Sequence, residues 1–142
     1  MRRVVLLLLS SLFSCSMPGI VVWEDPLTAE EHVNLGYIYE KKGELDLAKG
    51  EYQKAIKKDK SFWVAYYNLG NIYAKEGNYK KAQESYRRAL DINPEDPDTL
   101  NNLAYVLFKQ GKKEEALVLI KKAINMEDKK EYRNTLKEIE DN

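Results

Sequence analysis

Cysteine and histidine are nearly absent from this sequence, with one residue of each among 142. A single cysteine excludes a disulfide within the chain. One histidine and one cysteine cannot assemble a metal cluster of these ligands or offer a convincing catalytic Cys–His pair. No glycine-rich phosphate loop occurs either, because Gly43, Gly77 and Gly111 are isolated glycines 34 residues apart. The composition therefore argues against an enzyme and gives no reason to expect a metal or another cofactor.

An excess of charge of either sign is also missing, since 23 Lys and Arg residues balance 23 Asp and Glu residues. Without a bulk positive charge, no nucleic-acid partner is expected. Charged residues still make up 32% of the chain, which suits a fold with much solvated surface. Acidic pairs such as Glu114-Glu115 are interpreted as parts of solvated helix faces rather than as catalytic carboxylates.

Long hydrophobic runs are absent too. The apolar stretch at residues 4–13 follows Arg2 and Arg3 and is only ten residues long, whereas a membrane-spanning helix needs about 20. A basic start followed by a short apolar run is typical of a secretory signal, which we assign to residues 1–14.

The end of this leader, Leu12-Phe13-Ser14-Cys15, resembles the bacterial lipoprotein box. The resemblance implies thioether lipidation of Cys15, cleavage before it and acylation of the new N-terminus, which together give a membrane anchor. An ordinary signal peptide or an uncleaved anchor, without lipidation, is the alternative.

Residues 15–27 are interpreted as a tether linker, because they contain Pro18, Gly19 and Pro26. The twelve residues after Cys15 span at most ~40 Å when fully extended. A domain that follows them would therefore work close to the membrane that holds it.

A pattern of small and large residues recurs with a 34-residue period. In its middle copy, Tyr66, Leu69, Gly70 and Tyr73 share one face of a predicted helix. Gly77 and Asn78 separate this helix from a second one, which carries Ala82, Tyr86 and Ala89, and Pro94 ends the unit. Matching residues lie 34 positions earlier and later, at Leu35, Gly36, Tyr39, Gly43, Ala48, Tyr52 and Ala55, and at Leu100, Leu103, Ala104, Leu107, Gly111, Ala116, Ile120 and Ala123.

With this period and these residue types, residues 29–130 closely resemble the tetratricopeptide repeat family. The resemblance implies an all-α solenoid of three helix hairpins, at residues 28–62, 63–96 and 97–129. Tyr132, Leu136 and Ile139 form one apolar stripe, so residues 130–142 are predicted to be a capping helix and tail.

Several local features of the repeats can also be predicted. Thr28 with Glu31 indicates a capping box, and Asp96 before Pro97 indicates another helix start. Ser61 is expected to cap the first helix of the second repeat. Departures from the family pattern include Ala104 in place of glycine and Ile120 in place of an aromatic residue. His32 replaces a large apolar residue, and we expect it to be partly packed and partly in contact with water.

Three sets of side chains recur in phase on the first helix of each repeat. The sets are Asn34, Asn68 and Asn102; Tyr37, Asn71 and Tyr105; and Lys41, Lys75 and Lys109. Each lysine follows its asparagine by seven residues, or two helical turns, so the two share a face. The family resemblance places these first helices along a concave groove, where the sets become candidates for peptide binding. An asparagine amide both donates and accepts, and can therefore pair with a peptide backbone. The alternative is that the asparagines are a common family feature and the lysines are merely solvated.

One subclass of the family can be tested by residue type. The carboxylate clamp that binds chaperone tails would need lysine, asparagine and basic residues at the positions of Val33, Tyr37, Asn68, Asp98 and Asn102. Only Asn68 matches, so this clamp is not expected.

These patterns predict a membrane-tethered interaction module that binds a partner polypeptide. In broad form it is similar to repeat lipoproteins that act as pilotins for type IV pilus secretins or as envelope scaffolds. Ser16, rather than an aspartate, follows Cys15, which favours the periplasmic face of a bacterial outer membrane. The alternative function is self-association as a homodimer through an apolar face of Val64, Tyr67 and Phe108. Tyr67 and Phe108 are also candidates for peptide binding.

Overall fold

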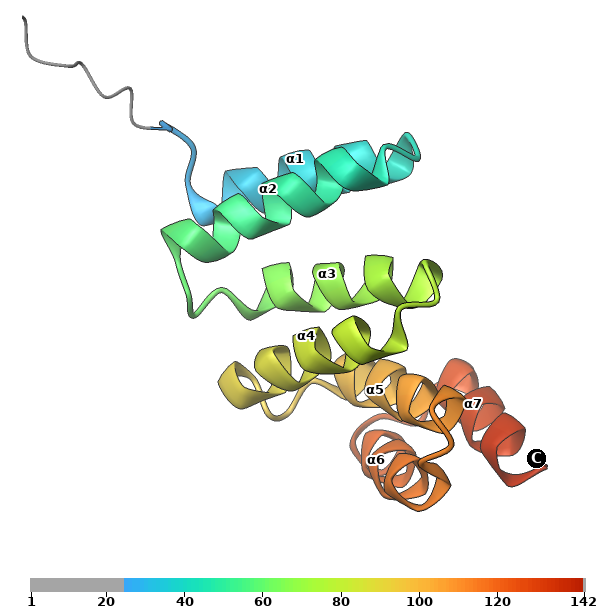
Figure 1. Ribbon diagram of the computed structural model, residues 1–142. Coiled ribbons are helices and arrows are strands. Elements are labelled where there is room, and N and C mark those ends of the chain that lie inside the picture. The colour runs from blue at the N-terminus through green and yellow to red at the C-terminus, as the bar shows by residue number, and fades with distance from the viewer. Residues whose placement is uncertain (1–24, 142) are drawn as a thin grey trace, which may run out of the picture.

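Helix hairpins stacked side by side make up the structure, a computed structural model that describes residues 25–141 (Figure 1). Within that range the elements are α1 (Ala29–Lys41), α2 (Leu45–Lys58), α3 (Trp63–Lys75), α4 (Tyr79–Ile92), α5 (Pro97–Lys109), α6 (Lys113–Met126) and α7 (Lys130–Glu140). The bounds of α1, α3 and α5 repeat every 34 residues, and so do those of α2, α4 and α6. The predicted all-α solenoid is confirmed.

Each hairpin reverses direction at a glycine in the left-handed region of backbone space. The φ angles of Gly43, Gly77 and Gly111 are +79°, +73° and +78°. An L-residue with a Cβ adopts such angles only with strain, so glycine is favoured at these three turns. The 34-residue spacing of the glycines therefore sets the spacing of the hairpins.

Side-chain caps start several helices as expected. Thr28 and Glu31 form the predicted capping box, in which Thr28 Oγ1 accepts a hydrogen bond from the Glu31 backbone N–H at 3.2 Å. Asn78 accepts from the backbone N–H of Lys81 at 3.3 Å, and Asp96 accepts from that of Thr99 at 2.8 Å. These bonds satisfy backbone donors that the first helical turn leaves unpaired.

The predicted cap at Ser61 is wrong. Phe62 is the N-cap residue of α3 and makes no side-chain cap. The Ser61 hydroxyl instead donates to Asp59 Oδ1 at 2.6 Å, and the same oxygen accepts from the Ser61 backbone N–H at 2.8 Å. The carboxylate that precedes Ser61 thus holds its hydroxyl away from the helix.

A close contact between a glycine and a tyrosine ring joins the two helices of the first two hairpins. A Cβ added to Gly36 would lie 2.5 Å from the ring of Tyr52, and one added to Gly70 would lie 2.5 Å from the ring of Tyr86. The third hairpin has Ala104 and Ile120 at these positions, and both are fully buried. The two departures from the repeat pattern are therefore coupled: Ile120 is smaller than tyrosine and leaves room for the methyl group of Ala104.

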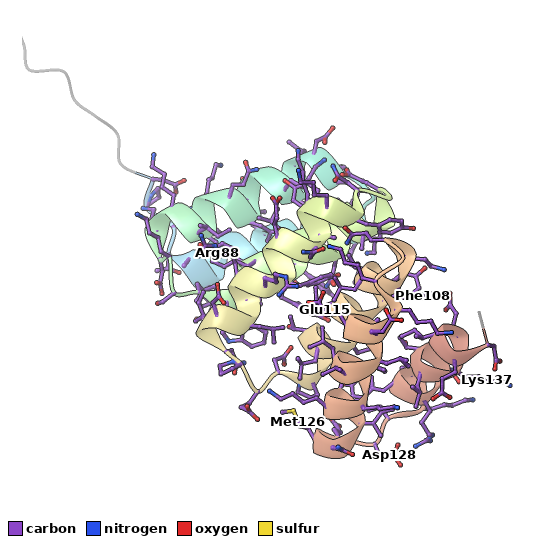
Figure 2. All side chains as sticks on the ribbon, turned by 60° about the horizontal axis from the view of Figure 1, so that its bottom comes forward. Arg88, Phe108, Glu115, Met126, Asp128 and Lys137 are labelled. Atoms are coloured by element: carbon purple, nitrogen blue, oxygen red, sulfur yellow. The ribbon has the colours of Figure 1, made fainter. Side chains whose placement is uncertain are left out.

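Helix α7 packs against α5 and α6 and covers the C-terminal end of the stack. Tyr132 and Ile139 are buried, and Leu136 packs against the same core, which confirms the predicted capping helix. Its connection to α6 contains three residues, against four before α3 and four before α5. The helix thus takes the place of the first helix of a fourth repeat, displaced by one residue. Figure 2 shows Met126 and Asp128 near the turn into α7, and Lys137 on its outer side.

The expectation for His32 is wrong, because this side chain is completely buried rather than partly in water. Nδ1 of His32 lies 2.7 Å from Glu51 Oε2, and Nε2 lies 3.2 Å from Asp25 Oδ2. Two carboxylates thus take the place of water around the buried ring. The repeat pattern of apolar positions could not predict these contacts, because it says nothing of which charged side chains lie nearby.

Candidate peptide-binding groove

The first helices of the second and third repeats and the capping helix surround a hollow of about 340 Å³. Residues from α3, α5 and α7 line it, together with the hydroxyl-bearing Tyr86 of α4: Asn71, Ala74, Lys75, Tyr86, Asn101, Asn102, Tyr105 and Thr135. Asparagine contributes three of these eight side chains. The hollow is therefore rich in groups that can both donate and accept hydrogen bonds.

The asparagines form a directed network across two repeats. Asn71 Oδ1 accepts from the Tyr86 hydroxyl at 2.8 Å and from Asn102 Nδ2 at 3.0 Å. Asn102 Oδ1 in turn accepts from Asn101 Nδ2 at 3.0 Å. Asn101 Oδ1, at the end of this chain of bonds, is buried without a hydrogen-bond partner. Because a buried unpaired acceptor is costly, a donor from a bound molecule would stabilise this site.

The three asparagines of the predicted set differ in what they contact. Asn34 is exposed and Asn68 is half-buried, and within residues 25–141 neither amide makes a hydrogen bond. Asn102 is committed to Asn71 and lies 3.4 Å from the Tyr67 hydroxyl. The amides of Asn34 and Asn68 are thus available to a ligand, whereas that of Asn102 positions its neighbours.

The lysines of the predicted set are held by nearby groups. Lys75 makes a close ion pair with Glu40 of the preceding repeat. Lys109 Nζ lies 2.6 Å from Glu138 Oε1 of α7, and this hydrogen bond raises the pKa of Lys109. Lys41 Nζ lies 4.9 Å from the centre of the Tyr37 ring. Two of the three cations therefore already face an anion, which weakens their attraction for an acidic ligand.

The aromatic candidates are spread over exposed and half-buried positions. Tyr37 is exposed, while Tyr105 is half-buried in the hollow with Lys109 Nζ 4.9 Å from its ring centre. Tyr67 packs between Trp63 and Tyr86, with ring centres 6.3 and 6.2 Å away, and burial raises its pKa.

The apolar face suggested for self-association is less exposed than a docking surface would be. Val64, Tyr67 and Phe108 are each half-buried and pack against the two hydrophobic cores. The strongly exposed apolar side chains are at other places, among them Ile38 on α1 and Val118 on α6.

Sequence reasoning missed Glu40, Asn101 and Thr135 as groove residues. The residue types of Glu40 and Asn101 do not recur in the other repeats. The position of Glu40 is taken there by Ala74 and Phe108, and that of Asn101 by Val33 and Tyr67. Thr135 lies in α7, whose register is displaced by one residue. A search for one residue type that recurs every 34 residues cannot find such positions, although Glu40 and Asn101 are in phase with the candidates Phe108 and Tyr67.

The leader at residues 1–14, Cys15 and the linker up to residue 24 lie outside the described residues. Between residues 25 and 141, none of the helices has the length and hydrophobicity needed to cross a bilayer.

Solved structures with similar folds include peptide-binding repeat domains. The first TPR domain of Spaghetti (RPAP3), bound to the HSP90 peptide SRMEEVD, matches with a TM-score of 0.77 and 23% identity, over 80% of this chain and 90% of that one. The N-terminal domain of stress-induced protein-1 from C. elegans matches with a TM-score of 0.68 and 21% identity, over 79% and 94%. YrrB, described as a TPR protein with an unusual peptide-binding site, matches with a TM-score of 0.73 and 28% identity, over 78% and 58%.

Curated protein sequences give no match to this chain. Family models do match it. Three models described as tetratricopeptide repeat cover residues 29–62, 51–84 and 98–126, and one described as TPR repeat covers residues 70–111. The matches run without a gap through the three hairpins that the structure shows. The chain therefore belongs to the tetratricopeptide repeat family.

Proposed function

We propose that this protein is a membrane-tethered interaction module that binds an extended segment of a partner polypeptide in the groove of α1, α3, α5 and α7. The observation that carries the proposal is the unengaged amide of Asn68 on α3, together with the unpaired amide oxygen of Asn101 in the hollow. Asn68 makes no hydrogen bond within the described part of the chain, and Asn101 offers a buried acceptor without a partner. Both suit a peptide backbone, which presents one donor and one acceptor per residue.

The charges of the groove favour recognition through the backbone rather than through an acidic tail. Lys75 and Lys109 are paired with Glu40 and Glu138. A peptide with several carboxylates would have to compete with these acids for the same cations. The peptide in the similar Spaghetti structure, SRMEEVD, is acidic at its end, so the partner proposed here differs in chemistry from that peptide.

The binding proposal is tested by mapping the face that a partner covers. The partner is captured from detergent-solubilised membranes, purified and added to the full chain, and amide hydrogen exchange is measured by mass spectrometry. Protection is expected on α3, α5 and α7, because their side chains line the hollow. Protection confined to the outer helices α4 and α6 would show that the groove is not the binding site.

We further propose that lipidation of Cys15 tethers this module to a bacterial envelope membrane, at the periplasmic face of the outer membrane. The proposal is supported by the lipoprotein-like sequence Leu12-Phe13-Ser14-Cys15 and by Ser16 after it. Acyl chains contribute about 0.8 kcal/mol per buried CH₂ group, so several of them would give firm attachment.

Mass spectrometry of the protein purified from its native membrane tests the anchor. The expected mature N-terminus is Cys15 carrying lipid, and Cys15→Ala should leave the leader uncleaved, because only a thiol can form the thioether. A native protein that starts at another residue, or whose Cys15 is unmodified, would contradict the lipoprotein proposal.

Self-association is a second candidate function, and Ile38 is the observation that favours it. The equivalent positions in the next two repeats, Ile72 and Val106, are completely buried, whereas Ile38 at the open N-terminal end is 49% exposed. A second copy could cover this end. Sedimentation of the full chain in detergent, with and without Ile38→Lys, distinguishes the two candidates. A monomer at micromolar concentration favours partner binding, and a dimer that Ile38→Lys dissociates favours self-association.

A further inference from the structure

The hollow between α3, α5 and α7 has an unpaired hydrogen-bond acceptor in its wall. Asn101 lines it from α5, Lys75 from α3 and Thr135 from α7. Asn101 Oδ1 is buried and has no hydrogen-bond partner within residues 25–141. The volume of about 340 Å³ is much larger than one water molecule needs. The hollow therefore has room for a side chain of a bound molecule.

Neighbouring hydrogen bonds determine which end of the Asn101 amide is left unpaired. Asn102 Nδ2 lies 3.0 Å from Asn71 Oδ1 and 3.4 Å from the Tyr67 hydroxyl. Asn102 Oδ1 is consequently turned toward Asn101 and accepts from Asn101 Nδ2 at 3.0 Å. The Tyr86 hydroxyl donates to Asn71 Oδ1 at 2.8 Å and completes the network. Asn101 thus uses its donor inside the protein and keeps its acceptor for the hollow.

Thr135 gives the hollow a second acceptor. Its hydroxyl donates to the backbone carbonyl of Glu131 at 3.2 Å, so its proton is already used and its oxygen lone pairs remain. Neither the Thr135 oxygen nor Asn101 Oδ1 can pair with a group that only accepts. A molecule that fills the hollow must therefore bring N–H or O–H donors, and two donors suit it better than one.

The charges at the hollow favour a neutral donor over a cationic one. Lys75 lines the hollow, and Lys109 Nζ lies 4.9 Å from the ring centre of Tyr105, which lines it too. An entering ammonium or guanidinium group would approach both of these cations. A lysine ammonium has three donors, and the bond from Lys75 to Glu40 uses one of them. The hollow therefore suits a neutral group that brings two N–H donors and one acceptor.

We propose, resting on the groove function proposed above, that the bound segment inserts an asparagine or glutamine side chain into this hollow. Its two N–H groups donate to Asn101 Oδ1 and Thr135 Oγ1, and its carbonyl oxygen accepts from Lys75. A carboxamide N–H is the same kind of donor as a backbone N–H, but a side chain extends from the main chain into the hollow. Aspartate and glutamate have nearly the same shape and are rejected, because an ionised carboxylate has no proton to donate.

Asn101 is the residue that determines this specificity, and it does so at one junction between repeats. The equivalent positions hold Val33 in the first repeat and Tyr67 in the second, neither of which has an amide. The terminal torsion of an asparagine side chain is broad, so a small rotation presents Asn101 Oδ1 to an entering donor. The preference for an amide should therefore concern a single position of the bound segment.

The experiment uses random peptides as probes, so that the natural partner need not be known. A phage-displayed library of linear peptides is selected on the full chain in detergent, and peptides that protect α3, α5 and α7 from hydrogen exchange are kept. These peptides should share an asparagine or glutamine at one position. Replacement of that residue by aspartate or glutamate should weaken binding about tenfold or more, measured by fluorescence anisotropy of the labelled peptide, because Asn101 Oδ1 is then left unpaired.

Variants of Asn101 connect the preference to this side chain. Asn101→Val copies Val33 of the first repeat and should bind the amide and acid peptides equally. Asn101→Asp keeps an acceptor oxygen and should still reject the acid peptide. Asn125→Ala, at an exposed position on α6, should discriminate as the unaltered chain does. Far-UV circular dichroism checks that each variant remains helical.

Two results would overturn the amide preference and leave the groove function standing. One is a set of groove-binding peptides without a shared asparagine or glutamine, or with equal affinity for the amide and acid forms. The other is a preference that persists in Asn101→Val, which would assign it to another residue. If no selected peptide protects α3, α5 and α7, the groove function itself fails, and the amide preference fails with it.

Discussion

At the scale of single residues, the hairpins depend on matched pairs of small and large side chains. Gly70 and Tyr86 are one such pair, since the ring of Tyr86 occupies the space that a Cβ on Gly70 would need. In the third hairpin, Ala104 and Ile120 stand at the equivalent positions and are both buried, so a larger small residue faces a smaller large one. The identity of one member of a pair therefore limits the size of the other.

Replacement of Gly70 by alanine tests this contact. The added methyl group would lie 2.5 Å from the Tyr86 ring, so Gly70→Ala should destabilise the protein by about 1–3 kcal/mol, measured from urea unfolding midpoints. Gly50→Ala in α2 is the matched control, because a Cβ there meets nothing within 4 Å. The control should be neutral or stabilising, since alanine favours helix over glycine.

A double variant shows whether the effect arises from this pair. Gly70→Ala combined with Tyr86→Ile copies the third repeat and should be more stable than Tyr86→Ile alone, because the methyl group then fills vacated space. Equal losses from Gly70→Ala and Gly50→Ala would mean that crowding at Tyr86 is not the cause.

At the scale of elements, α7 is joined to the third repeat by Asp98 as well as by its apolar stripe. The Tyr132 hydroxyl donates to Asp98 Oδ1, and Lys129 Nζ lies 3.0 Å from the same oxygen. Burial and this carboxylate raise the pKa of Tyr132 to about 12. Burial opposes ionisation of Asp98, but the bonds from Tyr132 and Lys129 outweigh it and lower the pKa of Asp98.

The depressed pKa of Asp98 predicts how the docking of α7 depends on pH. A carboxyl group whose pKa is lower in the folded state stabilises it at pH values above its unfolded pKa, near 4. That contribution is lost as the pH falls through the lower folded value. The stability of the unaltered chain should therefore fall more steeply below about pH 4 than that of Asp98→Asn.

Urea midpoints of the two proteins between about pH 2 and pH 6 provide the measurement. Asp141→Asn, at an exposed position beyond α7, should show the steep fall of the unaltered chain. Parallel curves for Asp98→Asn and the unaltered chain would show that this carboxylate does not couple α7 to pH.

At the scale of the whole molecule, a 34-residue period was sufficient to predict three hairpins, and the apolar stripe after them predicted the capping helix. Gly77 has the same left-handed backbone as the turn glycines of the other two hairpins, and Tyr86 meets Gly70 as Tyr52 meets Gly36. Such features can be deduced from repetition. His32 could not be placed correctly, because its burial depends on Asp25 and Glu51, which lie in other segments.

The groove was predictable only in part for the same physical reason. The 34-residue period identified the asparagine set of Asn34 and the lysine set of Lys41. Whether each member is free to bind a ligand depends on neighbouring side chains that do not repeat. Asn102 is engaged by Asn71, and Lys75 by Glu40, whereas Asn68 makes no such contact within residues 25–141. Contacts between repeats thus decide which members of a set remain free to bind.

The most direct test of groove binding is the affinity of the captured partner for variants of Asn68. Asn68→Ala removes an unengaged donor and acceptor, so binding should weaken by about 1–3 kcal/mol, while the urea midpoint stays nearly unchanged. Asn125→Ala, an exposed asparagine on α6, is the control and should bind as the unaltered chain does. If Asn68→Ala binds normally while Tyr67→Ala or Phe108→Ala abolishes binding at unchanged stability, the backbone-pairing account of the groove is contradicted.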